Sequence, residues 1–240
     1  MDGFPKNALK SFDYIFTATN QQYLQLSDLF KGTSKILIKA GYPKLDKLRL
    51  QTRSQDSCKK NKFKKIIFAP SFVDEGIYED VSIFYSSLEI ISFLIRENYS
   101  VVFRPHPLSF KRKKNDLYIK SIIHKFDKNF FSLDTETSYF NSYFCSDLMI
   151  TDVSGTSLNY RLAFQKPVIY FTPNIQKAIE AFSLIPELGT TCDEIKKLPD
   201  LIEKSCSENL SLEIPNAVFN LDKSVDKYVE LIDSIAHERN

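Results

Sequence analysis

The chain has 240 residues, 43% of them hydrophobic, which is enough to fold as one large domain or as one and a half small ones. Its 32 basic and 30 acidic residues leave a formal net charge of +2, so no overall field attracts nucleic acids and no nucleic-acid partner is expected. No stretch approaches the roughly 20 consecutive apolar residues that a transmembrane helix needs.

The cysteines and histidines also limit the chemistry. The four cysteines lie far apart without C-x-x-C spacing, and the chain has three histidines. This pattern indicates neither a zinc site nor a disulfide framework. The N-terminus lacks the charged and then apolar pattern of a secretory signal. We therefore expect a protein of the reducing cytoplasm that uses no metal and no cofactor.

Short apolar runs and segments with helical periodicity alternate along the chain. Strands are expected at residues 14–17, 36–38, 66–70, 100–103, 130–133, 148–151 and 167–171. Helices are expected at residues 21–30, 80–97, 115–126, 139–144, 154–164, 193–205 and 222–236. A charged stretch over residues 54–65 is expected to be an exposed linker.

Nearly uniformly apolar strands separated by helices are typical of a parallel sheet that is covered on both faces. The predicted fold class is therefore α/β, a doubly wound parallel sheet of the Rossmann type. Residues 1–35 are expected to form a separate N-terminal element, residues 36–220 the ligand-binding α/β domain, and residues 221–240 a closing helix.

Ligands of doubly wound sheets bind beyond the carboxyl ends of the strands. Glycine, hydroxyl or charged residues follow four of the expected strands, and these are Gly41, Ser71, Arg104 with His106, and Asp152 with Ser154. Ser71 is expected to close over a ligand, although a loop serine without a ligand is an equal alternative.

The turn after the strand at residues 148–151 is the strongest signal. It carries Ser154, Gly155, Thr156 and Ser157 at the start of a helix. Free backbone N–H groups and hydroxyls at a helix N-terminus favour a phosphate, so these residues are expected to bind one. The alternative is that Ser154 only caps the helix. Asp152 does not favour a phosphate by charge, and it is expected to orient the turn or to accept a hydrogen bond from a hydroxyl or a base.

The segment Arg104-Pro105-His106-Pro107 holds two cationic or donor side chains rigidly at another strand end. An arginine fork and an imidazole suit a diphosphate, because they donate to several of its oxygens. The alternative is that Arg104 pairs with a surface carboxylate. Two basic runs, at residues 59–65 and 111–114, are either solvated loops or a contact for an anionic membrane surface.

Four segments carry a resemblance to a known family. They are GYPKLD at residues 41–46, FAPSF at 68–72, RPHP at 104–107, and the block from SDLMITDVS at 146–154 to KP at 166–167. In this order they resemble the motifs of the CDP-glycerol glycerophosphotransferase family, which comprises teichoic-acid and capsule polymerases of GT-B architecture. The resemblance implies that the chain corresponds to the donor-binding half of such an enzyme.

The resemblance implies a transferase that moves an alcohol phosphate, such as glycerol phosphate, from a CDP-linked donor to a cell-envelope or capsular polymer, with CMP leaving. It implies that Arg104 and His106 contact the donor diphosphate, that His106 is a catalytic candidate, and that Ser154 and the following amides bind phosphate. Gly41 belongs to the first of the motifs and is expected at the donor site. The expected location is the cytoplasm, on the inner face of the membrane as a peripheral protein.

Several positions depart from the family pattern. Lys44 stands where an arginine is usual, Val153 replaces a tyrosine, and Gly155 replaces a second serine, so the donor's identity stays open. Asp2 holds the place of the histidine that resembling enzymes use as a general base, and it is the catalytic candidate there. A separate chain with the acceptor domain is an expected partner. The alternatives are a GT-B glycosyltransferase that uses a nucleotide sugar, or a catalytically incomplete nucleotide-binding subunit.

Overall fold

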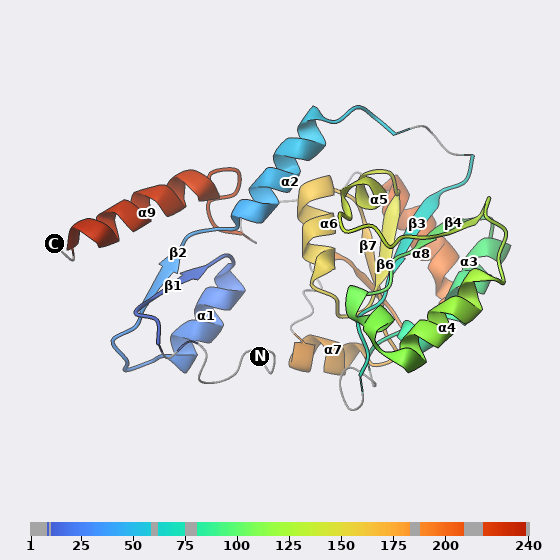
Figure 1. Ribbon diagram of the computed structural model, residues 1–240, viewed down its shortest axis with the longest axis horizontal. Helices are drawn as coiled ribbons and strands as arrows, with labels where there is room; N and C mark the ends of the chain where they lie inside the picture. The colour runs from blue at the N-terminus through green and yellow to red at the C-terminus, as the bar shows by residue number, and fades with distance from the viewer. Residues whose placement is uncertain are drawn as a thin grey trace. The chain divides into compact units, whose positions relative to one another are not determined.

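The computed structural model describes residues 9, 11–58, 62–74, 81–182, 188–208 and 218–238. The chain divides into two compact units (Figure 1). The first comprises residues 1–55 and 211–240, and the second comprises residues 56–210. These limits differ from the domain boundaries expected after residues 35 and 220.

The first unit is built on a parallel strand pair. β1 (Tyr14–Thr17) pairs with β2 (Ile36–Lys39), and α1 (Asn20–Leu29) connects them after Thr19, whose side chain accepts a hydrogen bond from the Gln22 amide and caps the helix. Residues 36–39 therefore belong to the first unit. They pair with residues 14–17, which were expected to form an N-terminal element separate from the domain that begins at residue 36. The unit also contains α2 (Pro43–Ser54) and α9 (Ser224–Glu238).

An ion-pair cluster ties α2 to the segment before α9. Nε of Arg49 lies 2.7 Å from Oδ1 of Asp222, and Nη2 of Arg53 lies 2.6 Å from Oδ2 of the same carboxylate. Asp46 accepts hydrogen bonds from the amides of Asp222 and Ser224 at 2.8 and 2.7 Å. These contacts join α2 to the C-terminal segment within the first unit.

The second unit holds a six-stranded sheet in which every neighbouring pair is parallel. Its strands are β3 (Lys65–Ala69), β4 (Ser100–Phe103), β5 (Phe131–Leu133), β6 (Leu148–Thr151), β7 (Val168–Phe171) and β8 (Thr190–Cys192). The spatial order is β5-β4-β3-β6-β7-β8. In chain order this is the 3-2-1-4-5-6 arrangement of a doubly wound Rossmann sheet, so the predicted fold class is confirmed.

Helices cover both faces of this sheet (Figure 1). The helices that follow the strands are α3 (Ser87–Arg96), α4 (Lys113–Ile123), α5 (Phe140–Phe144), α6 (Thr156–Phe164), α7 (Ile175–Phe182) and α8 (Leu198–Ser207), with short 3₁₀ turns at η1 (Phe84–Ser86), η2 (Pro107–Lys111) and η4 (Ile195–Lys197). Side chains from α3, α4 and α8 share one buried cluster with alternate residues of the strands.

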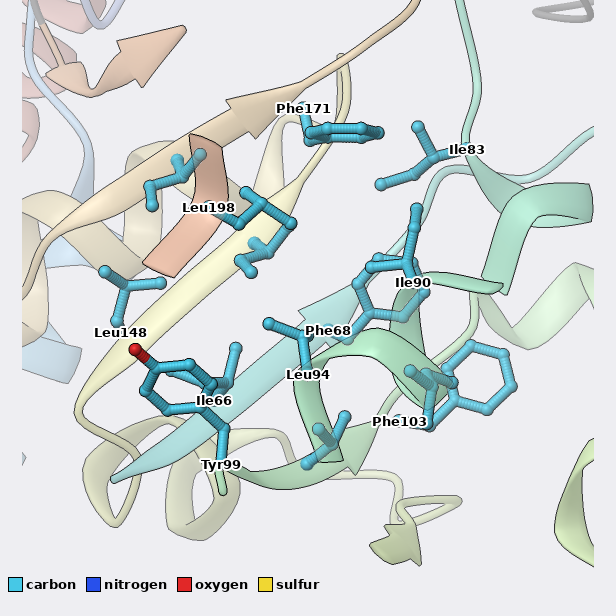
Figure 2. Close-up of a cluster of buried hydrophobic side chains, with 14 of the residues drawn as sticks. Ile66, Phe68, Ile83, Ile90, Leu94, Tyr99, Phe103, Leu148, Phe171 and Leu198 are labelled. Carbon is cyan, nitrogen blue, oxygen red and sulfur yellow. The ribbon is translucent and has the colours of Figure 1, made fainter. Parts of the chain in front are cut away.

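Figure 2 shows this cluster, in which Phe68 and Phe103 from the sheet lie against Ile90 and Leu94 of α3. Successive strand residues point to opposite faces, so Tyr170 of β7 faces away from the cluster that Phe171 joins. On that opposite face, α5 and α6 place tyrosines in contact with polar groups, as described below. Each large apolar side chain buried in this way stabilises the fold by about 1.5–3 kcal/mol.

One disulfide was not predicted from the cysteine spacing. Cys58 and Cys145 are bonded, with Cα atoms 5.5 Å apart and a sequence separation of 87. The pairing depends on the fold. Cys58 precedes β3 and Cys145 precedes β6, and these two strands are neighbours only in the folded sheet. Cys192 and Cys206 are free thiols. In the part of the chain that the structure describes, no helix is both long enough and apolar enough to cross a membrane.

Candidate functional site

The candidate site lies at the carboxyl ends of β3 and β6, where the order in which successive strands are added to the sheet reverses. β3 and β6 are neighbours at the centre of the strand order, and the helices that follow them, α3 and α6, cover opposite faces. The crevice beyond the carboxyl ends of such a pair is the usual ligand site of a doubly wound sheet. Ser71 follows β3, Arg104 follows β4 and Asp152 follows β6, so the topology brings these three predicted residues to one edge.

Asp152 fastens the ends of β3 and β6 together. Its carboxylate is fully buried and accepts the Ser71 amide at 3.0 Å, the Ser71 hydroxyl at 2.5 Å and the Ile83 amide at 3.1 Å. Burial raises the pKa of this carboxyl group, and the hydrogen bonds oppose that rise only in part. We therefore assign Asp152 a positioning role, in agreement with the expectation that it orients the turn or accepts a hydrogen bond from a hydroxyl, and a direct contact between Asp152 and the donor stays a prediction.

Ser71 is the other half of this clamp. It is 8% exposed, its hydroxyl donates to Asp152, and its carbonyl accepts the Ser82 hydroxyl at 3.4 Å. The contact with Ile83 also explains why the helix predicted from residue 80 begins later: residues 81–83 approach Asp152, and helical structure starts at Phe84.

Arg104 is paired with a buried carboxylate that sequence reasoning missed. Its Nη1 lies 2.6 Å from Oδ2 of Asp134, an ion pair without the directionality of a hydrogen bond, and its Nη2 donates to the Glu136 carbonyl at 2.8 Å. The Asp134 side chain is 5% exposed and also accepts the Ser142 hydroxyl and the Glu136 amide. Asp134 directly follows β5, as the other site residues follow their strands, and that position was the available signal.

His106 presents a hydrogen-bond donor to solvent. Its Nδ1 accepts the Leu108 amide at 3.2 Å, so the neutral ring carries its proton on Nε2. Burial of part of the ring lowers the pKa of His106 below its usual 6.5, which keeps the neutral form at pH 7. The Phe72 ring lies beside the imidazole, with centroids 6.0 Å apart. His106 therefore offers an Nε2–H group at the end of β4.

The start of α6 is open for a ligand. The helix begins at Thr156 after Gly155, no side chain caps its first turn, and the Ser154 hydroxyl forms no hydrogen bond to the described residues. The alternative that Ser154 serves only as a helix cap is therefore wrong. A Cβ atom built on Gly155 would meet no atom of the described residues within 4 Å, so these residues leave room beside this glycine.

The other two hydroxyls of this turn are already engaged. The hydroxyls of Thr156 and Tyr143 share a hydrogen bond of 2.5 Å. The Ser157 hydroxyl donates to the Ser154 carbonyl at 2.9 Å and accepts the Tyr170 hydroxyl at 3.0 Å. We therefore assign Thr156 and Ser157 to fixing the turn rather than to the direct contact expected of their side chains. The Ser157 amide donates to the Ser154 carbonyl at 3.2 Å, which leaves the Ser154 hydroxyl and the amides of Gly155 and Thr156 for a phosphate.

The comparison with protein families identifies the chain's relatives. Residues 5–181 match the model of the CDP-Glycerol:Poly(glycerophosphate) glycerophosphotransferase family. The chain belongs to this family. No curated protein sequence matches the chain.

Solved structures with the same fold include the wall teichoic acid polymerase TagF. It is 18% identical to this glycerophosphotransferase-family chain with a TM-score of 0.60 over 98% of the chain, and the chain spans 60% of that polymerase. A TagF variant soaked with CDPG is 15% identical with a TM-score of 0.56, over 98% of this chain and 59% of the other. The UDP-GlcNAc 2-epimerase of Methanocaldococcus jannaschii, in complex with UDP-GlcNAc and UDP, is 15% identical with a TM-score of 0.60, over 92% and 61%. These likenesses confirm the GT-B type of fold.

Two further residues of the family-like motifs have roles in the structure. Gly41 lies in the first unit with φ +101, and a Cβ there would lie 2.5 Å from the Phe219 carbonyl oxygen and 2.6 Å from the Ser224 hydroxyl. Glycine is therefore required at this position by close packing within its own unit, and donor contact by Gly41 stays a prediction. Asp2 lies outside the described residues.

In this glycerophosphotransferase-family chain, the Lys166 ammonium binds backbone carbonyls at the C-terminal end of α5. Its Nζ donates to the carbonyls of Tyr143, Phe144 and Ser146, at 3.2 Å and 2.5 Å for the first and last. Burial lowers the pKa of Lys166 to about 8. The lysine thus caps the C-terminal end of α5, and its role is structural.

Proposed function

We propose that this chain binds a CDP-activated alcohol phosphate, such as CDP-glycerol, for transfer of the alcohol phosphate to a cell-envelope or capsular polymer. Membership of the glycerophosphotransferase family supports this class of donor and acceptor. The observation that carries the proposal is the start of α6, where the Ser154 hydroxyl and the amides of Gly155 and Thr156 have no hydrogen-bond partner among the described residues.

The donor diphosphate lies against this turn in the proposed complex. The Ser154 hydroxyl and the amides of Gly155 and Thr156 donate to its oxygens, and the helix N-terminus favours its negative charge. Asp152 and Arg104 hold the strand ends in place. The carboxylate of Asp152 is bonded to Ser71, and the guanidinium of Arg104 is paired with Asp134. The site requires no metal ion in this proposal, because hydrogen-bond donors supply the neutralising contacts.

The proposed reaction is a displacement at the phosphorus that carries the alcohol. An acceptor hydroxyl attacks this phosphorus, a new P–O bond forms to the polymer, and the P–O bond to CMP breaks. The Nε2–H of neutral His106 donates to an oxygen of the departing CMP and stabilises its growing charge. We propose that the acceptor site comes from a further domain or a separate chain. The general base is then either Asp2 of this sequence or a residue of that domain or chain.

Isothermal titration of the 240-residue chain with CDP-glycerol tests the proposal. We expect binding by the wild type and about a tenfold or greater loss of affinity in Ser154→Ala, because a hydrogen bond to a charged group contributes about 1.5–3 kcal/mol. Ser132→Ala is the matched control: Ser132 is exposed in β5, and its hydroxyl forms no hydrogen bond within the described ranges, so its affinity is expected to be unchanged.

Parallel titrations with CMP and with UDP-GlcNAc separate the alternatives. Stronger binding of UDP-GlcNAc than of CDP-glycerol would select a nucleotide-sugar transferase of the same fold. Binding of CDP-glycerol without transfer to a polymer by this chain alone, and transfer after an acceptor-domain chain is added, would place the two halves of the enzyme in separate chains. No binding of any of these nucleotides would refute the proposed function.

A further inference from the structure

The short helix α5 contacts both halves of the proposed donor site. The Ser142 hydroxyl donates to Asp134, the carboxylate that pairs with Arg104 at the end of β4. The next residue, Tyr143, is 2% exposed, and its hydroxyl shares a hydrogen bond of 2.5 Å with the hydroxyl of Thr156, the first residue of α6. Two successive residues of α5 therefore brace the Arg104 side of the site and the turn that is proposed to bind phosphate.

The C-terminal end of α5 is fixed to other parts of the second unit. The helix has five residues, which is too short for a helix to be stable on its own, so its position depends on tertiary contacts. The Lys166 ammonium binds three backbone carbonyls at this end. Among these carbonyls lies Cys145, the C-cap residue of α5, and its sulfur is bonded to Cys58.

The disulfide attaches the segment before β3 to this helix. Residues 56–58 form no hydrogen bond with any described residue, so the bond between Cys58 and Cys145 fastens the segment to α5. Both cysteines are half-buried, so neither residue is shut off from solvent. In a reducing compartment, which the sequence predicts for this chain, disulfides are usually transient and redox-sensing.

We propose that the bond between Cys58 and Cys145 is a redox-sensitive strap that sets the donor affinity of this chain through α5. With the bond closed, α5 is anchored covalently, and Tyr143 is the positioning residue that holds the start of α6 in the geometry that binds phosphate. With the bond open, α5 loses this anchor, the hydrogen bond from Tyr143 to Thr156 weakens, and donor affinity falls. The inference rests on the proposed function, because the turn that Tyr143 braces belongs to the proposed donor site.

Thiol–disulfide exchange opens and closes the strap. The thiolate of a small dithiol attacks one of the two sulfurs, the other sulfur leaves and takes up a proton, and the second thiol of the reductant displaces the protein from the mixed disulfide. Two protein thiols and one disulfide of the reductant result, so two electrons pass from the dithiol to the protein. A small disulfide closes the strap by the reverse exchange and leaves as two thiols.

Titration of the full 240-residue chain with CDP-glycerol in the oxidised and the reduced state tests the strap. Thiol counting after denaturation verifies the states, with two thiols expected before reduction and four after it. We expect reduction by dithiothreitol to weaken the affinity about fivefold, the effect of one hydrogen bond, and reoxidation to restore it. Cys58→Ser should bind as weakly as the reduced wild type in both states, whereas Cys206→Ser, the control at a free thiol, should respond as the wild type does.

Tyr143→Phe separates the coupling through α5 from a general loss of stability. The variant lacks only the hydroxyl that contacts Thr156, so it should bind about fivefold more weakly than the oxidised wild type and should no longer respond to reduction. Tyr99→Phe is the matched control, because it removes the hydroxyl of another buried tyrosine, which donates to Glu203 of α8 at 3.3 Å. This control should keep the wild-type affinity and the full response. Circular dichroism verifies that each variant is folded.

Hydrogen exchange of the chain without donor gives a second measurement. The amides of Tyr143 and Ser157, which are hydrogen-bonded at α5 and at the start of α6, should exchange about fivefold faster after reduction. Affinities equal within about twofold in the two states, or a Tyr143→Phe variant that responds as fully as the wild type, would overturn the strap. Absence of binding in both states would refute the proposed function instead, and unchanged exchange at Tyr143 and Ser157 would then overturn the strap as well.

Discussion

Asp152→Ala is expected to lower the free energy of unfolding by about 3–5 kcal/mol, because three buried donors lose their acceptor and each unsatisfied donor costs about 1–3 kcal/mol. The donors are the amide and hydroxyl of Ser71 and the amide of Ile83. Since the clamp joins the two central strands at their carboxyl ends, its loss should also loosen the donor site. The expected loss is a large part of the about 5–15 kcal/mol that stabilises a typical domain.

Urea denaturation followed by circular dichroism measures this change. Asp200→Ala is the matched control, because Asp200 is exposed in the first turn of α8 and its removal should cost no more than about 1 kcal/mol. The free energy of unfolding of Asp152→Asn should lie between those of the wild type and the alanine variant. The asparagine side chain keeps one acceptor oxygen, but its NH₂ group faces the backbone N–H donors of Ser71 and Ile83. Equal stability of Asp152→Ala and the control would contradict the clamp.

Arg104→Ala is expected to destabilise the second unit by about 3 kcal/mol, at the lower end of the cost of removing one partner from a buried ion pair. It leaves the carboxylate of Asp134 almost fully buried without its cation, although the hydrogen bonds from Ser142 and Glu136 remain. The same change removes the link from the end of β4 to the Glu136 carbonyl, so donor affinity should fall as well.

A double-mutant cycle separates the ion pair from other effects of the substitution. Asp134→Asn removes the charge that Arg104 neutralises, so the double variant should be less destabilised than the sum of the single variants, with a coupling energy of about 2 kcal/mol. Arg96→Ala, at an exposed arginine in the last turn of α3, should change stability by no more than about 0.5 kcal/mol. Additive single effects would show that Arg104 and Asp134 do not act as a pair.

Much of the fold could be predicted because the central strands have few alternatives. Ile66 to Ala69 and Leu148 to Thr151 are short apolar runs, and in the structure both are buried on two faces. β8 escaped prediction because Thr190–Cys192 is three residues long and begins with two threonines, so it carries no apolar run. The division into two units could not be predicted either, since it depends on the pairing of β2 with β1 and on contacts between α2 and residues near the C-terminus.

The position of the site at the strand ends could be predicted from the sequence, but the hydrogen bonds and ion pairs of its side chains could not. Residue types at strand ends indicate the edge where a ligand binds, because parallel strands all end on the same side. The partners of those residues come from other elements: Asp134 for Arg104, Tyr143 for Thr156, and Tyr170 for Ser157. Sequence reasoning therefore treated engaged side chains as ligand contacts, whereas the Ser154 hydroxyl has no hydrogen-bond partner among the described residues, as the phosphate hypothesis requires.

A crystal structure of the chain with CDP-glycerol tests the central claim most directly. The account predicts the diphosphate at the first turn of α6, within hydrogen-bonding distance of the Ser154 hydroxyl and of Nε2 of His106. Well-ordered CDP-glycerol bound elsewhere on the chain, or bound at this edge without contact to either group, would contradict it.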